Sequence, residues 1–125
     1  MAQHMNKFPH DFVQEYLGLI AQFIPGETTL NQMRILQHIA LRSAGDKHPV
    51  CNTDICNALG MSAATVTRAI ASFIGAGIIS EEEDPKDGRR RFIMVSDGYR
   101  GDLDYKVIAL AKKYFGGNRA VTEMK

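Results

Sequence analysis

Apolar residues recur every three or four positions in the first part of the chain, a spacing that predicts amphipathic helices. The first such segment covers residues 8–24 and is followed by Pro25-Gly26, which would end it. A second helix is expected after Thr28 or Thr29, because a threonine hydroxyl can accept a hydrogen bond from the first turn. Ile35 and Ile39 are expected to flank its apolar face, which is formed by Leu30, Met33, Leu36 and Ala40.

Two further helices are predicted in close succession. The first is short, is capped within residues 51–53 and stops at Gly60, whereas the second covers about residues 63–74. Two helices that cross over so tight a turn need apolar side chains pointing toward each other. The side chains expected to point inward are those of Ile55, Leu59, Met61, Val66, Ala69, Ile70, Phe73 and Ile74.

After Gly77 the apolar period changes from 3.6 to 2. Residues 78–83 and 89–95 alternate as strands do, and the turn-forming residues 84–88 lie between them, so a two-stranded hairpin is predicted. Ser96 is expected to cap a last helix. The expected fold class is therefore mainly α with a small β-hairpin: a winged helix-turn-helix flanked by N- and C-terminal helices.

A chain of 125 residues is expected to form a single domain. We expect residues 28–96 to form a winged core, residues 8–24 and 97–115 to form dimerisation helices, and residues 116–125 to form a flexible tail. The outer helices carry more large apolar residues than so small a core can cover, which favours burial against a second copy over packing within a monomer. These residues are Phe8, Phe12, Phe23, Leu103, Leu110, Tyr114 and Phe115.

The composition, with 45% hydrophobic and 23% charged residues, is typical of a globular protein. No basic leader precedes an apolar segment, no stretch is long enough to span a bilayer, and Cys51 and Cys56 are too few for a disulfide framework, so we expect a cytoplasmic protein without a membrane partner. The four histidines are scattered, and no catalytic, cofactor or metal site is expected. The net charge of +1 means that any attraction to nucleic acid must come from local placement of charge.

The outward face of the 63–74 helix carries only small or hydroxylated side chains and one arginine. Such a face could lie in the major groove of DNA without steric conflict, although it also fits a solvated helix that binds nothing. Ser62 at the N-cap leaves backbone N–H groups that suit a phosphate. The outward side chains are those of Ala63, Ala64, Thr65, Thr67, Arg68 and Ala71.

The hairpin tip and its returning strand carry four basic residues within six positions, namely Lys86, Arg89, Arg90 and Arg91. A narrow tip bearing guanidinium groups can enter the minor groove. Opposite them lie four acidic residues, 81–84, so some of the arginines are expected to pair within the hairpin. Arg89 lies at the tip, and of the three arginines it is expected to take the smallest part in such ion pairs.

The run from Asp54 to Ser96 closely resembles the MarR family of bacterial transcription regulators. The resemblance rests on Asp54-Ile55-Cys56-Asn57-Ala58-Leu59-Gly60-Met61-Ser62, on the helix that follows, and on Asp84-Pro85-Lys86-Asp87-Gly88-Arg89. It implies a homodimeric repressor that binds double-stranded DNA at a near-palindromic operator. By position, Ser62, Ala64, Thr65, Thr67 and Arg68 fall on the recognition helix of the family, and Asp87 and Arg89 fall on its wing-tip pair, in which the aspartate holds the arginine.

Three features depart from the family pattern. Glu81–Glu83 stand where relatives commonly carry basic residues, Cys56 replaces the usual alanine, and the C-terminal part supplies about one helix where relatives have two. The resemblance also implies a small-molecule effector, whose identity the sequence does not specify. Two alternatives stay open: a winged-helix adaptor that binds a protein partner, and a DNA-binding protein for plasmid or phage replication or partition.

Overall fold

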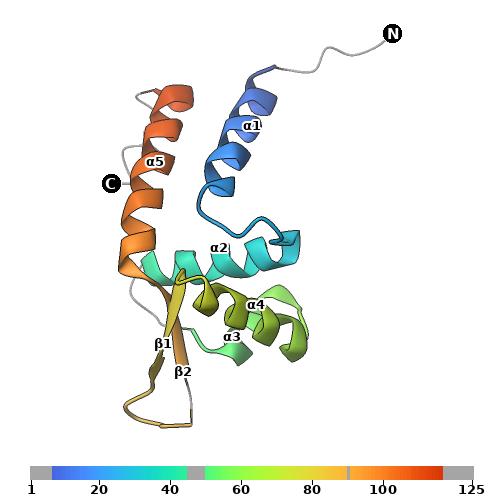
Figure 1. Cartoon of the computed structure of the whole chain (residues 1–125), viewed down its shortest axis with the longest axis vertical. Helices are drawn as coiled ribbons and strands as arrows, with labels where there is room; N and C mark the ends of the chain where they lie inside the picture. Colours follow the sequence, from blue (N-terminus) through green and yellow to red (C-terminus); the bar gives the residue numbers. More distant parts are fainter. Residues whose placement is uncertain (1–6, 45–49, 90, 117–125) are drawn as a thin grey trace. The chain divides into compact units, whose positions relative to one another are not determined.

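The computed structural model describes residues 7–44, 50–89 and 91–116 (Figure 1). The chain divides into two compact units, one of which spans Pro25–Arg100. The other unit combines the segments before and after that span. Arg90 and residues 117–125 of the expected tail lie outside the described residues.

The described residues form five helices and two strands in the predicted order. They are α1 (Lys7–Ala21), α2 (Leu30–Ala44), α3 (Asn52–Leu59), α4 (Ala63–Gly75), β1 (Ile79–Glu83), β2 (Arg91–Val95) and α5 (Asp97–Phe115). This order confirms the predicted fold class of a mainly helical protein with a small antiparallel hairpin. The dimerisation role of the outer helices and the role of the tail stay predictions.

The first helix ends earlier than predicted, at Ala21 instead of at residue 24. The N–H of Gln22 donates to the carbonyl of Leu19 at 3.1 Å, and that of Phe23 donates to the carbonyl of Ile20 at 2.9 Å. These are the tighter three-residue hydrogen bonds that often close a helix. Pro25 has no N–H with which to extend the helix and disfavours a helical conformation in the residue before it.

Thr29, and not Thr28, caps α2. The N–H of Gln32 donates to Thr29 Oγ1 at 3.1 Å, and the N–H of Thr29 donates to Gln32 Oε1 at 2.9 Å. This reciprocal pair is a capping box, which satisfies two backbone donors at the helix start. The second helix therefore begins where the sequence places a threonine three residues before a glutamine.

The buried face of α2 differs from the predicted one. Ile35 and Ile39, expected at its edges, are 0% exposed, whereas Leu30, expected on the face itself, is 72% exposed. The helix packs against β2, α3 and α4. Apolar side chains project from several sides of α2, so the elements that pack against the helix decide which of these side chains are buried.

The hairpin pairs Ile79 with Val95 and Glu83 with Arg91 in antiparallel register. On the other edge of β2, the N–H of Ile93 donates to the carbonyl of Val50 at 2.8 Å, which adds a single bridge to the sheet. Ile79, Ile93 and Val95 are buried. The inner face of the hairpin is thus anchored in the core of its unit.

The core of the Pro25–Arg100 unit confirms most of the predicted inward positions. Ile55, Val66 and Ala69 are 0% exposed, and Ile70 and Phe73 are also buried. Leu59 and Met61 are half-buried. Ile74 is an error of the prediction, because it is 37% exposed. It lies one residue beyond Phe73, and one step along a helix turns a side chain by about 100° away from the buried face.

The other unit is held by an aromatic cluster, defined here as Phe8, Phe12, Tyr114 and Phe115. Their rings contact across α1 and α5 at centroid distances of 5.5–5.8 Å. Lys113 Nζ lies 2.7 Å from Glu15 Oε1, and the hydroxyl of Tyr114 donates to the same carboxylate. The aromatic cluster was expected to face a second copy, but its rings pack against one another within one chain. Packing within one chain is the alternative that the sequence left open. None of the described helices has the length and apolar character to cross a membrane.

Candidate nucleic-acid interface

The turn between α3 and α4 is built on Gly60. This residue has φ 65° and ψ 37°, a left-handed conformation that glycine adopts without a steric penalty. The N–H of Met61 then donates to the carbonyl of Cys56 at 3.2 Å, which closes the end of α3. Ile55 and Val66 pack beneath the turn with no exposed surface. The helices α3 and α4 pack against each other, and the small side chain of Cys56 lets them cross closely, as the sequence predicted.

Ser62 caps the start of α4. Its Oγ accepts a hydrogen bond from the N–H of Thr65 at 3.2 Å and donates to Thr65 Oγ1 at 3.0 Å. Thr65 is half-buried, whereas Ala64, Thr67 and Arg68 are exposed. Ala63 and Ala71 are exposed as well, so the face of α4 predicted to be outward does reach the surface. The Ser62 side chain itself satisfies one of the backbone donors that were considered for a phosphate.

Asn52, at the first position of α3, connects to this outward face. Its Nδ2 donates to Thr67 Oγ1 at 3.0 Å, and its Oδ1 accepts from Cys56 Sγ at 3.2 Å. No sequence motif marks Asn52 as part of this face. Fifteen residues separate Asn52 from Thr67, and no local pattern connects them, so only the crossing of the two helices brings them together.

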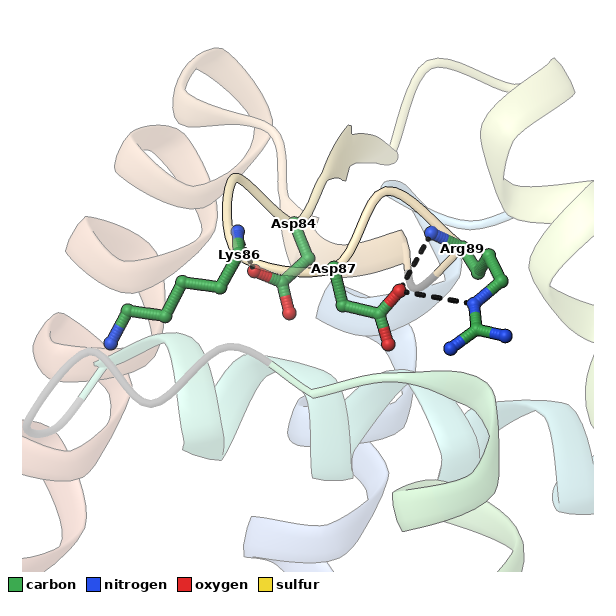
Figure 2. A network of polar contacts seen from close by, with 4 residues as sticks. All are labelled: Asp84, Lys86, Asp87 and Arg89. Carbon is green, nitrogen blue, oxygen red and sulfur yellow. Dashed lines mark hydrogen bonds and ion pairs between the residues drawn. The ribbon is translucent and has the colours of Figure 1, made fainter.

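The hairpin tip is ordered by two aspartates, shown in Figure 2. Asp84 is 7% exposed, and its Oδ1 accepts from the N–H of Lys86 at 2.8 Å. Asp87 Oδ1 accepts from the N–H of Arg89 at 3.1 Å and lies 3.4 Å from Arg89 Nε (Figure 2). The Arg89 side chain is nevertheless 93% exposed. The tip thus presents the Arg89 guanidinium group to solvent, while Asp87 contacts its Nε and the backbone N–H of the same residue.

The other described arginine of the wing is partly paired, as expected. Arg91 Nη2 lies 4.0 Å from Glu81 Oε1. In the strand register Arg91 is opposite Glu83 and Glu81 is opposite Ile93, so the ion pair is a diagonal one between neighbouring strands. Arg90, the remaining predicted wing residue, lies outside the described residues.

A cavity of about 510 Å³ lies between the start of α3, α4 and the hairpin. Thr67, Arg89 and Arg91 all line it, together with Asn52 and Glu81. Three of the predicted site residues, from α4 and from the wing, therefore face one hollow. The lining does not include the other described candidates, which are Ser62, Ala64, Thr65, Arg68, Lys86 and Asp87.

The described ranges contain no group of three His, Cys, Asp or Glu side chains placed to share a metal ion. The cavity lining offers hydroxyl groups, one amide, two guanidinium groups and the carboxylates of Asp54 and Glu81. These groups bind by hydrogen bonds and by charge, and guanidinium groups are well suited to phosphate and to base edges.

Comparison with solved structures reveals the same fold in bacterial regulators. S. aureus MepR in complex with DNA aligns with a TM-score of 0.68 at 18% identity, covering 93% of this chain and 88% of MepR. A probable transcriptional regulator from Pseudomonas aeruginosa aligns with a TM-score of 0.53 at 21% identity, covering 92% and 85% of the two chains. Bordetella bronchiseptica BpsR, whose DNA binding is regulated by 6-hydroxynicotinic acid, aligns with a TM-score of 0.52 at 22% identity, covering 97% and 86%.

The sequence comparisons give one match and one negative result. No curated protein matches the chain. The family model described as the MarR family matches residues 28–90, a range that contains α2, the α3–α4 crossing, β1 and the wing tip. The chain belongs to the MarR family, and it has the winged-helix fold of that family's regulators.

Proposed function

We propose that this protein is a cytoplasmic, sequence-specific transcription regulator, a repressor that binds double-stranded DNA as a homodimer at a near-palindromic operator. The observation that carries the proposal is the shared cavity of Thr67 and Arg89. Because both line one hollow, Thr67 on α4 and Arg89 at the tip of the wing lie on the same side of their unit. A protein that grips two adjacent grooves of a duplex needs this arrangement.

In the proposed complex α4 lies in the major groove. Ala64 and Thr67 are small enough to let the helix approach the bases, and Arg68 is an exposed guanidinium on the same helix. Arginine is the side chain most often used to recognise guanine, through O6 and N7. Ser62 and Thr65, which hydrogen-bond to each other, would fix the start of the helix near the phosphates.

The wing is proposed to enter the adjacent minor groove through Arg89. The bond to Asp87 limits the freedom of this side chain before DNA arrives, which lowers the entropy lost on binding. Lys86 is exposed at the same tip and would contact phosphate. Arg91 takes a smaller part, because Glu81 already neutralises part of its charge. Arg90 stays a candidate on its sequence position alone.

The homodimer is proposed from the apolar surface left open on α1 and α5. Val13 is 47% exposed and Leu17 is 50% exposed, although both are large and apolar. A second copy would remove such surface from water and would place two α4 helices about one turn of DNA apart, ~34 Å. The likeness to BpsR supports a small-molecule effector as well, whose chemistry the described residues do not specify.

The test is duplex binding measured by fluorescence anisotropy at several salt concentrations, on a site selected from a random library. We expect wild-type protein to select a near-palindromic site and to bind it with a salt dependence typical of phosphate contacts. Arg68→Ala and Arg89→Ala should each weaken binding about tenfold, since a specific arginine contact is worth about 1–3 kcal/mol. Arg34→Ala is the matched control, because Arg34 is exposed on α2 and hydrogen-bonds to Asn31.

The acidic strand favours a second function, that of an adaptor which binds a basic protein partner through the wing. Glu81, Glu82 and Glu83 are all exposed on β1, and carboxylates repel phosphate. If wild-type protein binds no duplex at low salt, or if both arginine variants bind as tightly as wild type, the adaptor function replaces the DNA-binding one.

A further inference from the structure

We propose that Asn52 is a positioning residue that determines base preference at α4, by holding the Thr67 hydroxyl as a hydrogen-bond donor toward DNA. The inference rests on the proposed DNA-binding function and adds a residue outside the α4 helix to its specificity. It is carried by two hydrogen bonds of one amide. Asn52 Nδ2 donates to Thr67 Oγ1 at 3.0 Å, and Asn52 Oδ1 accepts from Cys56 Sγ at 3.2 Å.

The amide of Asn52 makes one contact with each of its two ends. Its Oδ1 accepts from the Cys56 thiol, and its NH₂ group faces Thr67. An NH₂ group can only donate, and Thr67 Oγ1 must therefore accept. One lone pair of the hydroxyl is then occupied, and its hydrogen points away from Asn52.

The consequence concerns which base edges Thr67 can recognise. In the major groove guanine offers N7 and O6 as acceptors, adenine offers N7, and thymine offers O4, whereas cytosine offers an amino donor. A hydroxyl that already accepts from Asn52 has its hydrogen free to donate to one of these acceptors, whereas a single lone pair is left to accept from cytosine. We therefore expect cytosine to be disfavoured at the base that Thr67 contacts.

The start of α3 does not need the Asn52 side chain. The N-cap residue is Cys51, whose N–H donates to Asp54 Oδ2 at 3.0 Å. The helix is thus capped by two other residues, and the amide of Asn52 is turned toward α4 instead. A purely structural role would leave base preference unchanged when Asn52 is replaced.

The experiment compares complete base-preference profiles on the selected site, with every single base-pair substitution measured for each variant. Asn52→Ala should lower the discrimination against cytosine at one position in each half-site about two- to tenfold, the range expected for one neutral hydrogen bond. Thr67→Val should produce the same loss, and the double variant should lose no more than Thr67→Val alone, since the two residues act as one unit.

Asn52→Asp provides a second and sharper variant. Its carboxylate can only accept, so the Thr67 hydroxyl would donate inward and leave its oxygen to accept from a base. We expect preference at the same position to shift toward cytosine or adenine, which present amino donors. The added negative charge lowers affinity for every duplex, and so the ratio between bases is the measure. Asn57→Ala and Asn57→Asp are matched controls at another exposed position of α3. Thermal unfolding of each variant verifies that it is folded.

The inference fails if wild-type protein selects a site while both Asn52 variants keep its base profile, or if the effects of Asn52→Ala and Thr67→Val add. The proposed function survives that result. If wild-type protein selects no sequence and binds no duplex, the proposed function is wrong, and the proposed role of Asn52 is then wrong as well.

Discussion

The carboxylate of Asp87 holds Arg89 by two contacts, one to the backbone N–H at 3.1 Å and one to Nε at 3.4 Å. The same oxygen, Oδ1, makes both contacts, so the loop and the side chain are ordered together (Figure 2). Asp87 is negatively charged and would by itself repel DNA. Its value to a DNA-binding wing must therefore lie in the conformation that it imposes on Arg89.

This balance predicts that Asp87→Ala changes specific and non-specific binding in opposite directions. Loss of the order at Arg89 should weaken binding to the selected site about two- to fivefold, the range given by exposed ion pairs. Removal of a negative charge should strengthen binding to an unrelated duplex. Anisotropy titrations on both duplexes provide the measurement, and an unchanged ratio of the two affinities would show that Asp87 does not organise the wing.

Glu81→Gln should increase affinity for DNA. The substitution removes a repulsive charge and releases Arg91, which lies 4.0 Å from Glu81. If Arg91 then contacts a phosphate, the slope of log Kobs against log salt should become steeper by about one. Glu82→Gln is the control, because Glu82 pairs with Phe92 in the strand register and its side chain points to the opposite face of β1. Equal slopes for both variants would contradict a specific release of Arg91.

If α1 forms the proposed dimer interface, Leu17→Glu should convert the dimer into a monomer. Leu17 is 50% exposed on α1, and a charge buried at an apolar interface without a partner strongly disfavours association. Light scattering coupled to size-exclusion chromatography measures the mass of the particle directly. Gln14→Glu, at an exposed position of the same helix, should keep the wild-type mass. A Leu17→Glu protein that stays dimeric would exclude this part of α1 from the dimer interface.

Phe73→Ala and Ile74→Ala should differ widely in stability. Phe73 is 1% exposed whereas Ile74 is 37% exposed. Truncation of a buried phenylalanine costs about 3–5 kcal/mol because it leaves a cavity, while truncation of the neighbouring exposed residue should cost less than about 1 kcal/mol. Urea unfolding measures both. Similar losses of stability for the two variants would mean that the Ile74 side chain is buried in a core contact. That result would contradict the described packing of α4.

Local chemistry made most element boundaries predictable. Thr29 and Ser62 cap helices through bonds that reach only three residues along the chain, and Gly60 ends α3 through its own backbone conformation. The turn of the wing is likewise local, since Asp84 and Asp87 each bond a backbone N–H two residues ahead. Such interactions depend on neighbouring residues alone, and a sequence displays them directly.

The amino-acid sequence by itself thus determined the order of the elements, the helix-turn-helix with its wing, and the exposed face of α4. The tertiary structure decided what depends on partners distant in the chain: that Ile35 and Ile39 form the centre of the α2 face, that Glu81 pairs diagonally with Arg91, and that Asn52 meets Thr67. The apolar period of a sequence predicts which side of a helix is buried, with an error of about one residue position. Which neighbour a side chain then touches is decided only when the elements pack, because packing selects among faces that are nearly equal in apolar character.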